Sequence, residues 1–421
     1  MNKEKKIVPE LRFPEFASEG DWVELTLGEI SDRIEEKVEN RKLTTVSISA
    51  GVGFVSQAEK FSRDISGQQY KNYVVLRNGD FSYNKGNSKK FPQGCIYKLK
   101  EFEEAAVPNA FISFKFKDNY IGDFYQGYFD NNYHGKQLQK FITSGARMDG
   151  LLNISPNDFF TILFPTPKNP KEQKKIASFL TSLGELITAH KKRLEALREY
   201  KKGLMQNIFP QEGKKIPNLR FSEFKNAKPW TETALNKLVE RIVFKNSGIL
   251  TTTVFTNSAT NGIVEQREYF DKDIADKSNL SNYYVVEPGD YVYNPRISNA
   301  APVGPISKNK LNKTGAMSPL YTVFRFKEKN DSFFEYYFKS NHWFESIKKV
   351  ANTGARFDRI SITDSILMGI PILYPESKEQ QKIASCLSNL DCLIKEQSDR
   401  LNQLREYKKG MIQRLFPNNN F

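Results

Sequence analysis

The amino-acid sequence predicts an α+β protein made of two tandem copies of one unit, each a mixed, β-rich domain followed by one long helix. Three observations predict this fold. Segments near both ends of a unit recur in the same order about 207 residues later. Each copy ends in a heptad pattern of apolar residues. Short strand-like segments separated by turn signals come before that pattern. A chain of 421 residues is long enough for two or three domains.

The repeat is clearest at the ends of the units. The hexapeptide that begins at Leu11 recurs with one change at Leu219, and the heptapeptide Leu-Arg-Glu-Tyr-Lys-Lys-Gly that begins at Leu197 recurs without change at Leu404. The interiors of the two copies share only scattered residues. This uneven divergence indicates a constant frame around two variable domains.

The repeat predicts the domain boundaries. We place the first domain at residues 1–169 and its long helix at 170–210, then the second domain at 211–377 and its long helix at 378–421. Within the domains, the pattern predicts strand–turn–strand segments over 74–83 and 285–293, strands over 111–116 and 320–326, and helices over 122–142 and 332–350, with Ser332 as the N-cap of the last.

The long helices are predicted from apolar residues at steps that alternate between four and three. This seam consists of Ile176, Leu180, Leu183, Ile187, Leu194, Leu197 and Leu204 in the first copy, and of Ile383, Leu387, Leu390, Ile394, Leu401, Leu404, Met411 and Leu415 in the second. Asn169 followed by Pro170 marks the first start, and Ser377 to Gln380 forms a capping box at the second. Pro210 and Pro417 end the helices.

A seam of this length needs a partner helix, and the other copy in the same chain can supply one. We expect the two helices to pair as an antiparallel coiled coil of about 48 Å, with pseudo-two-fold symmetry and the domains at opposite ends. The alternative is that each helix packs on its own domain.

Charge predicts a polyanionic partner. Lys and Arg number 63 against 49 Asp and Glu, a net charge of +14, which favours nucleic acid or an anionic membrane surface. The mean hydropathy of −0.57 and the lack of a long apolar run argue against a membrane. The charged N-terminus leads into no apolar segment, so we expect no signal peptide, and three cysteines suit the reducing cytoplasm.

A search for catalytic motifs finds none that is convincing. His134, His190 and His342 are far apart and have no Cys or carboxylate at metal-ligand spacing. The sequence contains neither the P-loop of ATPases nor the nucleophile motif of hydrolases. Asn294-Pro295-Arg296-Ile297 is similar to the Asn-Pro-Pro-aromatic tetrad of amino-methyltransferases in its first two residues only. We therefore expect a binding protein with no catalytic, metal or cofactor site of its own.

Polar and basic loops in corresponding places of the two copies could contact DNA. Base edges are read by Arg, Asn, Gln, Ser and Thr, and phosphates are bound by Lys and Arg. The variable stretches Ser47–Gln57 and Thr256–Gln266 are further candidates. The predicted DNA-binding residues are Asn84, Lys85, Asn87, Ser88, Lys89, Lys90 and Arg147 in the first copy, and Asn294, Arg296, Ser298, Asn299, Arg356 and Arg359 in the second.

The duplicated order of these motifs resembles the specificity (S) subunit of type I restriction-modification systems. The matching features are the Leu-Arg-Phe-x-Glu-Phe segment and tryptophan that open each domain, and the Lys-Glu-Gln-x-x-Ile-Ala sequence that opens each long helix, at Lys171 and at Lys378. The resemblance covers the whole chain. One difference is that Pro170 precedes the first of these sequences whereas Ser377 precedes the second.

The resemblance implies a non-catalytic subunit of a DNA adenine methyltransferase and endonuclease. Two target recognition domains would each read one half of an interrupted, asymmetric site in double-stranded DNA. The helices would set the spacing between the halves and dock two methyltransferase (M) subunits, through which motor-nuclease (R) subunits join. S-adenosylmethionine, ATP and Mg²⁺ would belong to those partners.

Two other readings stay open on sequence alone. A stand-alone DNA-binding regulator with two reading domains would bind its site without a methyltransferase. A methyltransferase or nuclease with an unfamiliar motif would bind a cofactor or turn over substrate when pure.

Overall fold

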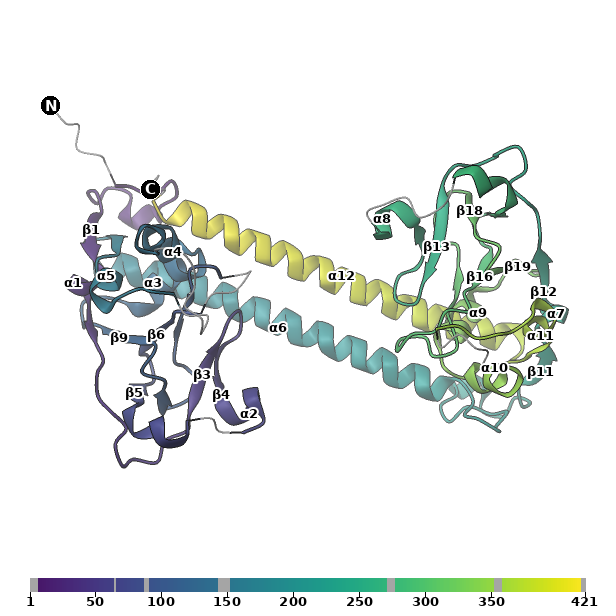
Figure 1. The fold of residues 1–421 in the computed structure, drawn as a ribbon, viewed down its shortest axis with the longest axis horizontal. Helices are drawn as coiled ribbons and strands as arrows, with labels where there is room; N and C mark the ends of the chain where they lie inside the picture. Colours follow the sequence, from purple (N-terminus) through teal and green to yellow (C-terminus); the bar gives the residue numbers. More distant parts are fainter. Residues whose placement is uncertain are drawn as a thin grey trace. The chain divides into compact units, whose positions relative to one another are not determined.

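The computed structural model describes residues 7–63, 66–86, 91–142, 152–270, 277–351 and 358–417 (Figure 1). The chain packs as two compact units, residues 1–192 with 399–421, and residues 193–398. Each unit therefore contains one β-rich domain, the first half of the long helix that follows it and the second half of the other long helix.

The first copy of the repeat holds one domain of short strands and helices before its long helix. Its strands are β1 (Val23–Thr26), β2 (Ser31–Arg33), β3 (Val46–Ser49), β4 (Gly53–Ser56), β5 (Val74–Arg77), β6 (Phe81–Asn84), β7 (Cys95–Lys98), β8 (Glu104–Val107), β9 (Ile112–Phe116) and β10 (Leu163–Thr166). Its helices are α1 (Leu27–Ile30), α2 (Gln57–Phe61), α3 (Gly122–Asp130), α4 (Tyr133–Leu138), α5 (Pro156–Phe160) and the long α6 (Pro170–Ile208). Short 3₁₀ turns lie at Pro14–Phe16, Gly67–Asn72 and Gln139–Phe141.

The second copy of the repeat has the same order of elements. Its strands are β11 (Thr231–Ala234), β12 (Val239–Ile242), β13 (Val254–Ser258), β14 (Gly262–Glu265), β15 (Tyr284–Val286), β16 (Tyr291–Tyr293), β17 (Ile306–Lys308), β18 (Gly315–Met317), β19 (Thr322–Phe326) and β20 (Pro371–Tyr374). Its helices are α7 (Leu235–Leu238), α8 (Gln266–Phe270), α9 (Ser332–Lys339), α10 (Phe344–Val350), α11 (Asp364–Gly369) and the long α12 (Ser377–Leu415). Its 3₁₀ turns lie at Ser222–Phe224 and Lys277–Asn282.

The sheets of the two domains correspond. Each domain has one antiparallel four-stranded sheet, in the order β2-β9-β6-β7 or β12-β19-β16-β17. A second layer is β14-β13-β18-β15 in the second domain, and in the first it is the pairs β3-β4 and β5-β8, joined by a parallel bridge between Thr45 and Ala106. Each domain thus builds the same frame, as the repeat predicts.

The predicted strand–turn–strand segments do form strands, but the two strands on either side of each turn do not pair with each other. Strand β5 pairs with β8, whereas β6 pairs with β7 and β9. The turn between them carries the chain from one sheet to the other. Asp80 in this turn is buried, and its carboxylate accepts the backbone N–H of Arg77 at 2.7 Å. Asp290 accepts the N–H of Glu287 at 2.8 Å in the second copy.

The predicted helix over 332–350 is wrong in two respects. It is two helices, α9 and α10, separated by a break at 340–343, and the residue at its N-cap position is Asp331 rather than Ser332. At the break the hydroxyl of Ser340 donates to the carbonyl of Tyr337 at 2.6 Å, so this side chain competes with the helical backbone. The counterpart over 122–142 also divides, at Asn132, whose φ is 53°.

The predicted α+β fold with paired antiparallel helices is confirmed within each unit (Figure 1). The first half of α6 lies with the second half of α12, and the second half of α6 with the first half of α12. Every predicted seam residue is buried or half-buried. The first halves also pack on their own domains, because Ile176 and Leu180 belong to the core of the first domain and Ile383 and Leu387 to that of the second.

The helix starts differ slightly from the prediction. The side chain of Asn169 accepts the N–H of Lys171 at 3.0 Å, as expected for the residue before Pro170. Ser377 is the first helical residue, so Glu376 stands at the N-cap position in place of Ser377. Both helices end two residues before a proline, Pro210 or Pro417.

A buried ion pair joins the opening segment of each domain to the start of its long helix. Arg12 donates to Glu172 through Nε at 2.7 Å and Nη2 at 2.8 Å. Arg220 and Glu379 repeat this pair at 2.8 and 2.6 Å. Within each pair both side chains are less than a tenth exposed. The hydrogen bonds that Arg12 donates to Glu172 raise the pKa of Arg12 despite the cost of burial.

His134 lies in the core of the first domain. It is 2% exposed, and the rings of Tyr83 and Phe129 pack edge-on against it at centroid distances of 6.1 and 5.9 Å. Burial lowers the pKa of His134 to about 4. The neutral imidazole therefore acts as one more ring of the aromatic core.

This burial predicts a pH-dependent stability. The unfolded chain binds a proton at His134 near pH 6.5, and the folded chain does so only near pH 4, so stability falls as the pH drops through this window. We expect the His134→Phe variant to lose less stability than the parent chain between pH 6.5 and 5, by about 1.5 kcal/mol. Urea titrations of both proteins at the two pH values measure this difference, and equal losses would contradict it.

Candidate nucleic-acid interface

The loop between β16 and β17 has a well-defined frame, by which we mean the hydrogen bonds and close backbone contacts that fix its two ends. The side chain of Asn294 is buried, donates to the carbonyl of Asn257 at 2.9 Å and accepts the N–H of Arg296 at 3.0 Å. At the other end Gly304 has a φ of +79°, and a Cβ there would lie 2.1 Å from the carbonyl oxygen of Asn294. Tyr293 donates to the carbonyl of Val303 at 3.0 Å. The two ends of the loop are thus held together.

The loop between β6 and β7 has the same frame. Asn84 donates to the carbonyl of Ile48 at 3.3 Å and accepts the N–H of Gly86 at 2.8 Å. Gly94 has a φ of +77°, and a Cβ there would lie 2.4 Å from the carbonyl oxygen of Asn84. Tyr83 donates to the carbonyl of Gln93 at 2.7 Å. One scaffold therefore carries two different loop sequences.

Two further segments of each copy contact its loop. The N–H of Leu152 donates to the carbonyl of Lys85, and the N–H of Ile360 donates to that of Pro295, each at 2.9 Å. The variable stretches form the hairpins β3–β4 and β13–β14, to which the asparagines of the two loops are bonded. In each copy the variable hairpin is thus a neighbour of the described part of the loop.

The individual predicted residues fall into three groups. Asn87, Ser88, Lys89, Lys90, Arg147 and Arg356 lie outside the described residues. Asn84, Lys85 and Asn294 are half-buried or buried and bonded to backbone carbonyls, so they shape the loops. Arg296, Ser298, Asn299 and Arg359 remain accessible to a partner, and Arg359 among them is half-buried.

The second domain presents a set of side chains suited to a DNA groove. Arg296 is 60% exposed, with its Nη2 3.5 Å from Asp358. Ser298 and Asn299 are exposed on the same loop, and Thr260 and Asn261 are exposed at the turn of the neighbouring hairpin. A guanidinium can read guanine and a carboxamide can read adenine through paired hydrogen bonds in the major groove.

The first domain presents different chemistry at the corresponding hairpin. Its turn is Ala50-Gly51-Val52, and Val52 is 73% exposed. Lys60 donates to the carbonyl of Ile48 at 3.0 Å, and burial lowers the pKa of this lysine. An apolar contact with a thymine methyl group is the kind of readout that such a turn can make.

Sequence reasoning missed Gly94 and Gly304, which close the two loops. Both are ten residues beyond the loop asparagine, so the repeat contained the signal. It also missed Thr260 and Asn261 as individual residues, although they lie within the predicted variable stretch.

The described residues contain no group of three or more His, Cys, Asp or Glu side chains that could hold a metal ion. Among the same residues, no helix combines the length and the apolar composition that a membrane crossing requires.

Comparisons with known proteins agree with these features. A family model described as the type I restriction modification DNA specificity domain matches residues 210–406. The type I restriction enzyme MjaVIII specificity subunit of Methanocaldococcus jannaschii is 24% identical over 67% of this chain and 68% of its own length. The putative type I restriction enzyme MjaX specificity subunit of that organism is 25% identical over 70% and 68%.

Solved structures show the same fold. The S subunit of a type I restriction-modification system from M. genitalium has a TM-score of 0.57 and 13% identity, and the match covers 98% of this chain and 100% of that one. A chain from a structure of type I system assembly and conformational transition has a TM-score of 0.51 and 16% identity, over 94% and 97%. In its duplicated domains and paired helices, the chain is similar to the specificity subunits of type I restriction-modification systems.

Proposed function

We propose that each recognition domain reads one half of a bipartite, asymmetric DNA site, and that the paired helices set the spacing between the halves. The observation that carries this proposal is the pair of loops at Asn84–Gly94 and Asn294–Gly304. They share their buried frame, residue for residue, and differ in the side chains between its ends. This is the arrangement expected of two readers with different targets.

We further propose that the helices dock two methyltransferase subunits at the repeated heptapeptide. Packing between the helices accounts for Leu197 and Lys201, which face the seam. It does not account for the neighbouring identical residues, which include Tyr200 at 62% and Tyr407 at 54% exposure. Exposed tyrosine is frequent in protein interfaces, and two identical surfaces suit two copies of one partner.

In this proposal the chain is a non-catalytic subunit that works in the cytoplasm. The M subunits bring S-adenosylmethionine and methylate adenine, which must leave the base stack to react. The R subunits join through the M subunits and use ATP and Mg²⁺. Basic groups of the recognition domains neutralise phosphates, so we expect DNA affinity to fall steeply with salt.

The test is a methylation map of the host genome with and without the gene, combined with a pull-down of the chain at native expression. We expect methylated adenine to disappear from one interrupted motif when the gene is deleted, and a methyltransferase to co-purify with the chain. An unchanged methylome in a host whose partner genes are active would contradict the proposal. It would favour the stand-alone regulator.

A further inference from the structure

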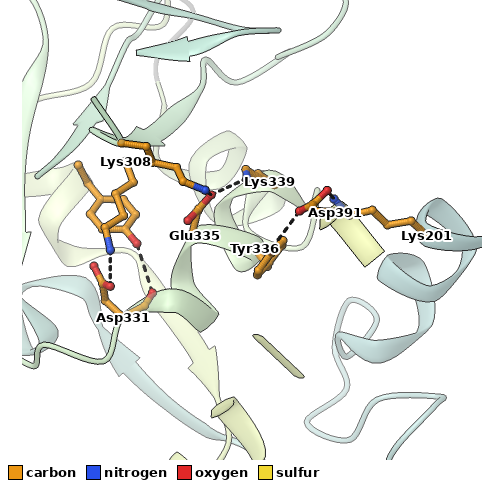
Figure 2. A network of polar contacts seen from close by, with 9 residues as sticks. Lys201, Lys308, Asp331, Glu335, Tyr336, Lys339 and Asp391 are labelled. Carbon is orange, nitrogen blue, oxygen red and sulfur yellow. Dashed lines mark hydrogen bonds and ion pairs between the residues drawn. The ribbon is translucent and has the colours of Figure 1, made fainter. Parts of the chain in front are cut away.

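Lys201 and Lys408 occupy equivalent heptad positions in line with the apolar seam of the two long helices. The partner of this lysine differs between the two units. In the second unit the Nζ of Lys201 lies 2.5 Å from Oδ1 of Asp391 on α12. The hydroxyl of Tyr336, on α9, donates to the other oxygen of that carboxylate at 2.9 Å (Figure 2). The long helix itself therefore supplies the acid.

In the first unit the domain supplies the acid. Lys408 is the repeat counterpart of Lys201, and Gly184 is the counterpart of Asp391. A Cβ at Gly184 would lie 3.6 Å from the Nζ of Lys408, so the two positions face each other as in the second unit. The carboxylate near Lys408 belongs to Asp130, at the end of α3, with an N–O distance of 3.5 Å.

The domain helices α3 and α9 differ in the opposite way, because the acid lies on the helix of the first domain and a lysine takes its place in the second. The shared aromatic pattern of α3 and α9 aligns Asp130 with Lys339 and Gly127 with Tyr336. Lys339 pairs with Glu335 at 2.6 Å (Figure 2). Gly127 lies against the end of α12, where a Cβ would be 2.5 Å from the ring of Phe416. A tyrosine fits at one position, and only a glycine fits without movement at the other.

We propose that each recognition domain and the first half of its long helix form one matched unit, which fits the second half of either long helix. The first unit combines Asp130 with Gly184, and the second combines Lys339 with Asp391. Either combination gives the seam lysine one carboxylate. The lysine itself is the same in both helices, so the second halves are interchangeable.

The proposal predicts which exchanges mismatch. If the domains alone are exchanged, the residues placed near Lys408 are Lys339 and Gly184, and neither provides a carboxylate. Lys201 then lies near two carboxylates, those of Asp130 and Asp391. The site is half-buried, with Lys201 at 18% and Asp391 at 43% exposure. Burial acts to raise the pKa of Asp391, and the hydrogen bonds from Lys201 and Tyr336 outweigh it and lower that pKa. When one member of a partly buried ion pair is removed, the other charge is left uncompensated, and the fold loses stability.

The first experiment moves the carboxylate near Lys408 from the domain helix α3 to the long helix α6, within the full chain. We expect Asp130→Asn to lower the melting temperature of the first unit by about 1–3 °C, and Gly184→Asp added to it to restore at least half of the loss. Gly410→Asp is the matched control, since this helical glycine lies in the same unit and a Cβ there has nothing within 4 Å. Equal effects of Gly184→Asp and Gly410→Asp would overturn the proposal.

The second experiment exchanges the domains with two kinds of junction. Junctions at the helix starts, after residues 169 and 376, should give a lower melting temperature than junctions inside the helices, after Lys192 and Asp399. Adding Gly184→Asp with Asp391→Gly to the first chimera should recover part of the difference. Equal melting temperatures for the two chimeras would overturn the proposal.

The consequence for DNA specificity rests on the proposed function, but the melting temperatures do not. If the stabilities follow the junctions and no methylated motif changes, the matched unit stands and the reading function fails. If the junctions have no effect on stability and the motif is exchanged all the same, the reading function stands and the matched unit fails.

Discussion

Replacing Glu379 by Gln is expected to lower the free energy of unfolding of the second unit by about 3–5 kcal/mol. The variant keeps the shape of the side chain and removes its charge. Arg220 is then left with an unpaired charge in a site where it is 6% exposed. Its remaining bonds, from Nη1 to the carbonyl of Ala227 at 2.8 Å and from Nη2 to that of Lys228 at 3.0 Å, cannot neutralise it.

Urea unfolding followed by tryptophan fluorescence measures this loss, because Trp230 lies in the core of the second unit. Glu396→Gln is the matched control, since Glu396 is exposed on the same helix, and it should change the stability by less than about 0.5 kcal/mol. Glu172→Gln should act on the first unit in the same way. A loss at Glu379 as small as at Glu396 would mean that the buried pair contributes little.

The ion pair also shows what the sequence could predict and what it could not. The two motifs that carry the family resemblance were visible as separate repeats, one around Arg12 and one around Glu172. Their contact was not visible, because about 160 residues separate them. Charge complementarity between two repeated motifs was the available signal, but a pattern along the chain does not say which distant groups meet.

The helices were predictable in detail because their signal is local. A heptad pattern predicts both the helix and its buried side, and every seam residue is buried or half-buried in the structure. The strands were predictable as elements but not in their pairing. Strands β5 and β6, on either side of the Gly79-Asp80 turn, belong to different sheets. The alternation of residues along one strand carries no information about which strand it pairs with.

The candidate interface was predictable as a place but not residue by residue. The loop and the variable hairpin of each copy were identified, and the structure brings the described parts of these two segments together. Asn294 and Arg296 looked equivalent in the sequence, since both are polar residues of one loop. The structure separates them, because the Asn294 side chain satisfies backbone groups while Arg296 is 60% exposed. Burial decides between these roles.

Replacing Arg296 by Ala is therefore expected to weaken recognition of the half-site that we propose the second domain reads. The expected loss is about 5- to 150-fold, the 1–3 kcal/mol of one paired contact with a base. Methylation of the parent motif by the reconstituted complex, measured at limiting enzyme, gives this ratio. Lys348→Ala is the control, since Lys348 is 54% exposed on α10 of the same domain, and it should leave the rate within two-fold. A parent-like rate for the Arg296 variant would remove this residue from the interface.

The Arg296→Lys variant distinguishes a contact with a base from a contact with phosphate. Lysine keeps the charge but loses the planar pair of donors that matches guanine. If Arg296 reads a base, Arg296→Lys should lose nearly as much as Arg296→Ala and relax the motif at one position of one half. If Arg296 binds phosphate, Arg296→Lys should retain most of the affinity, and Arg296→Ala should weaken all sequences alike with a shallower salt dependence. In both cases the half-site of the first domain stays unchanged, because the loop that presents Arg296 belongs to the second domain alone.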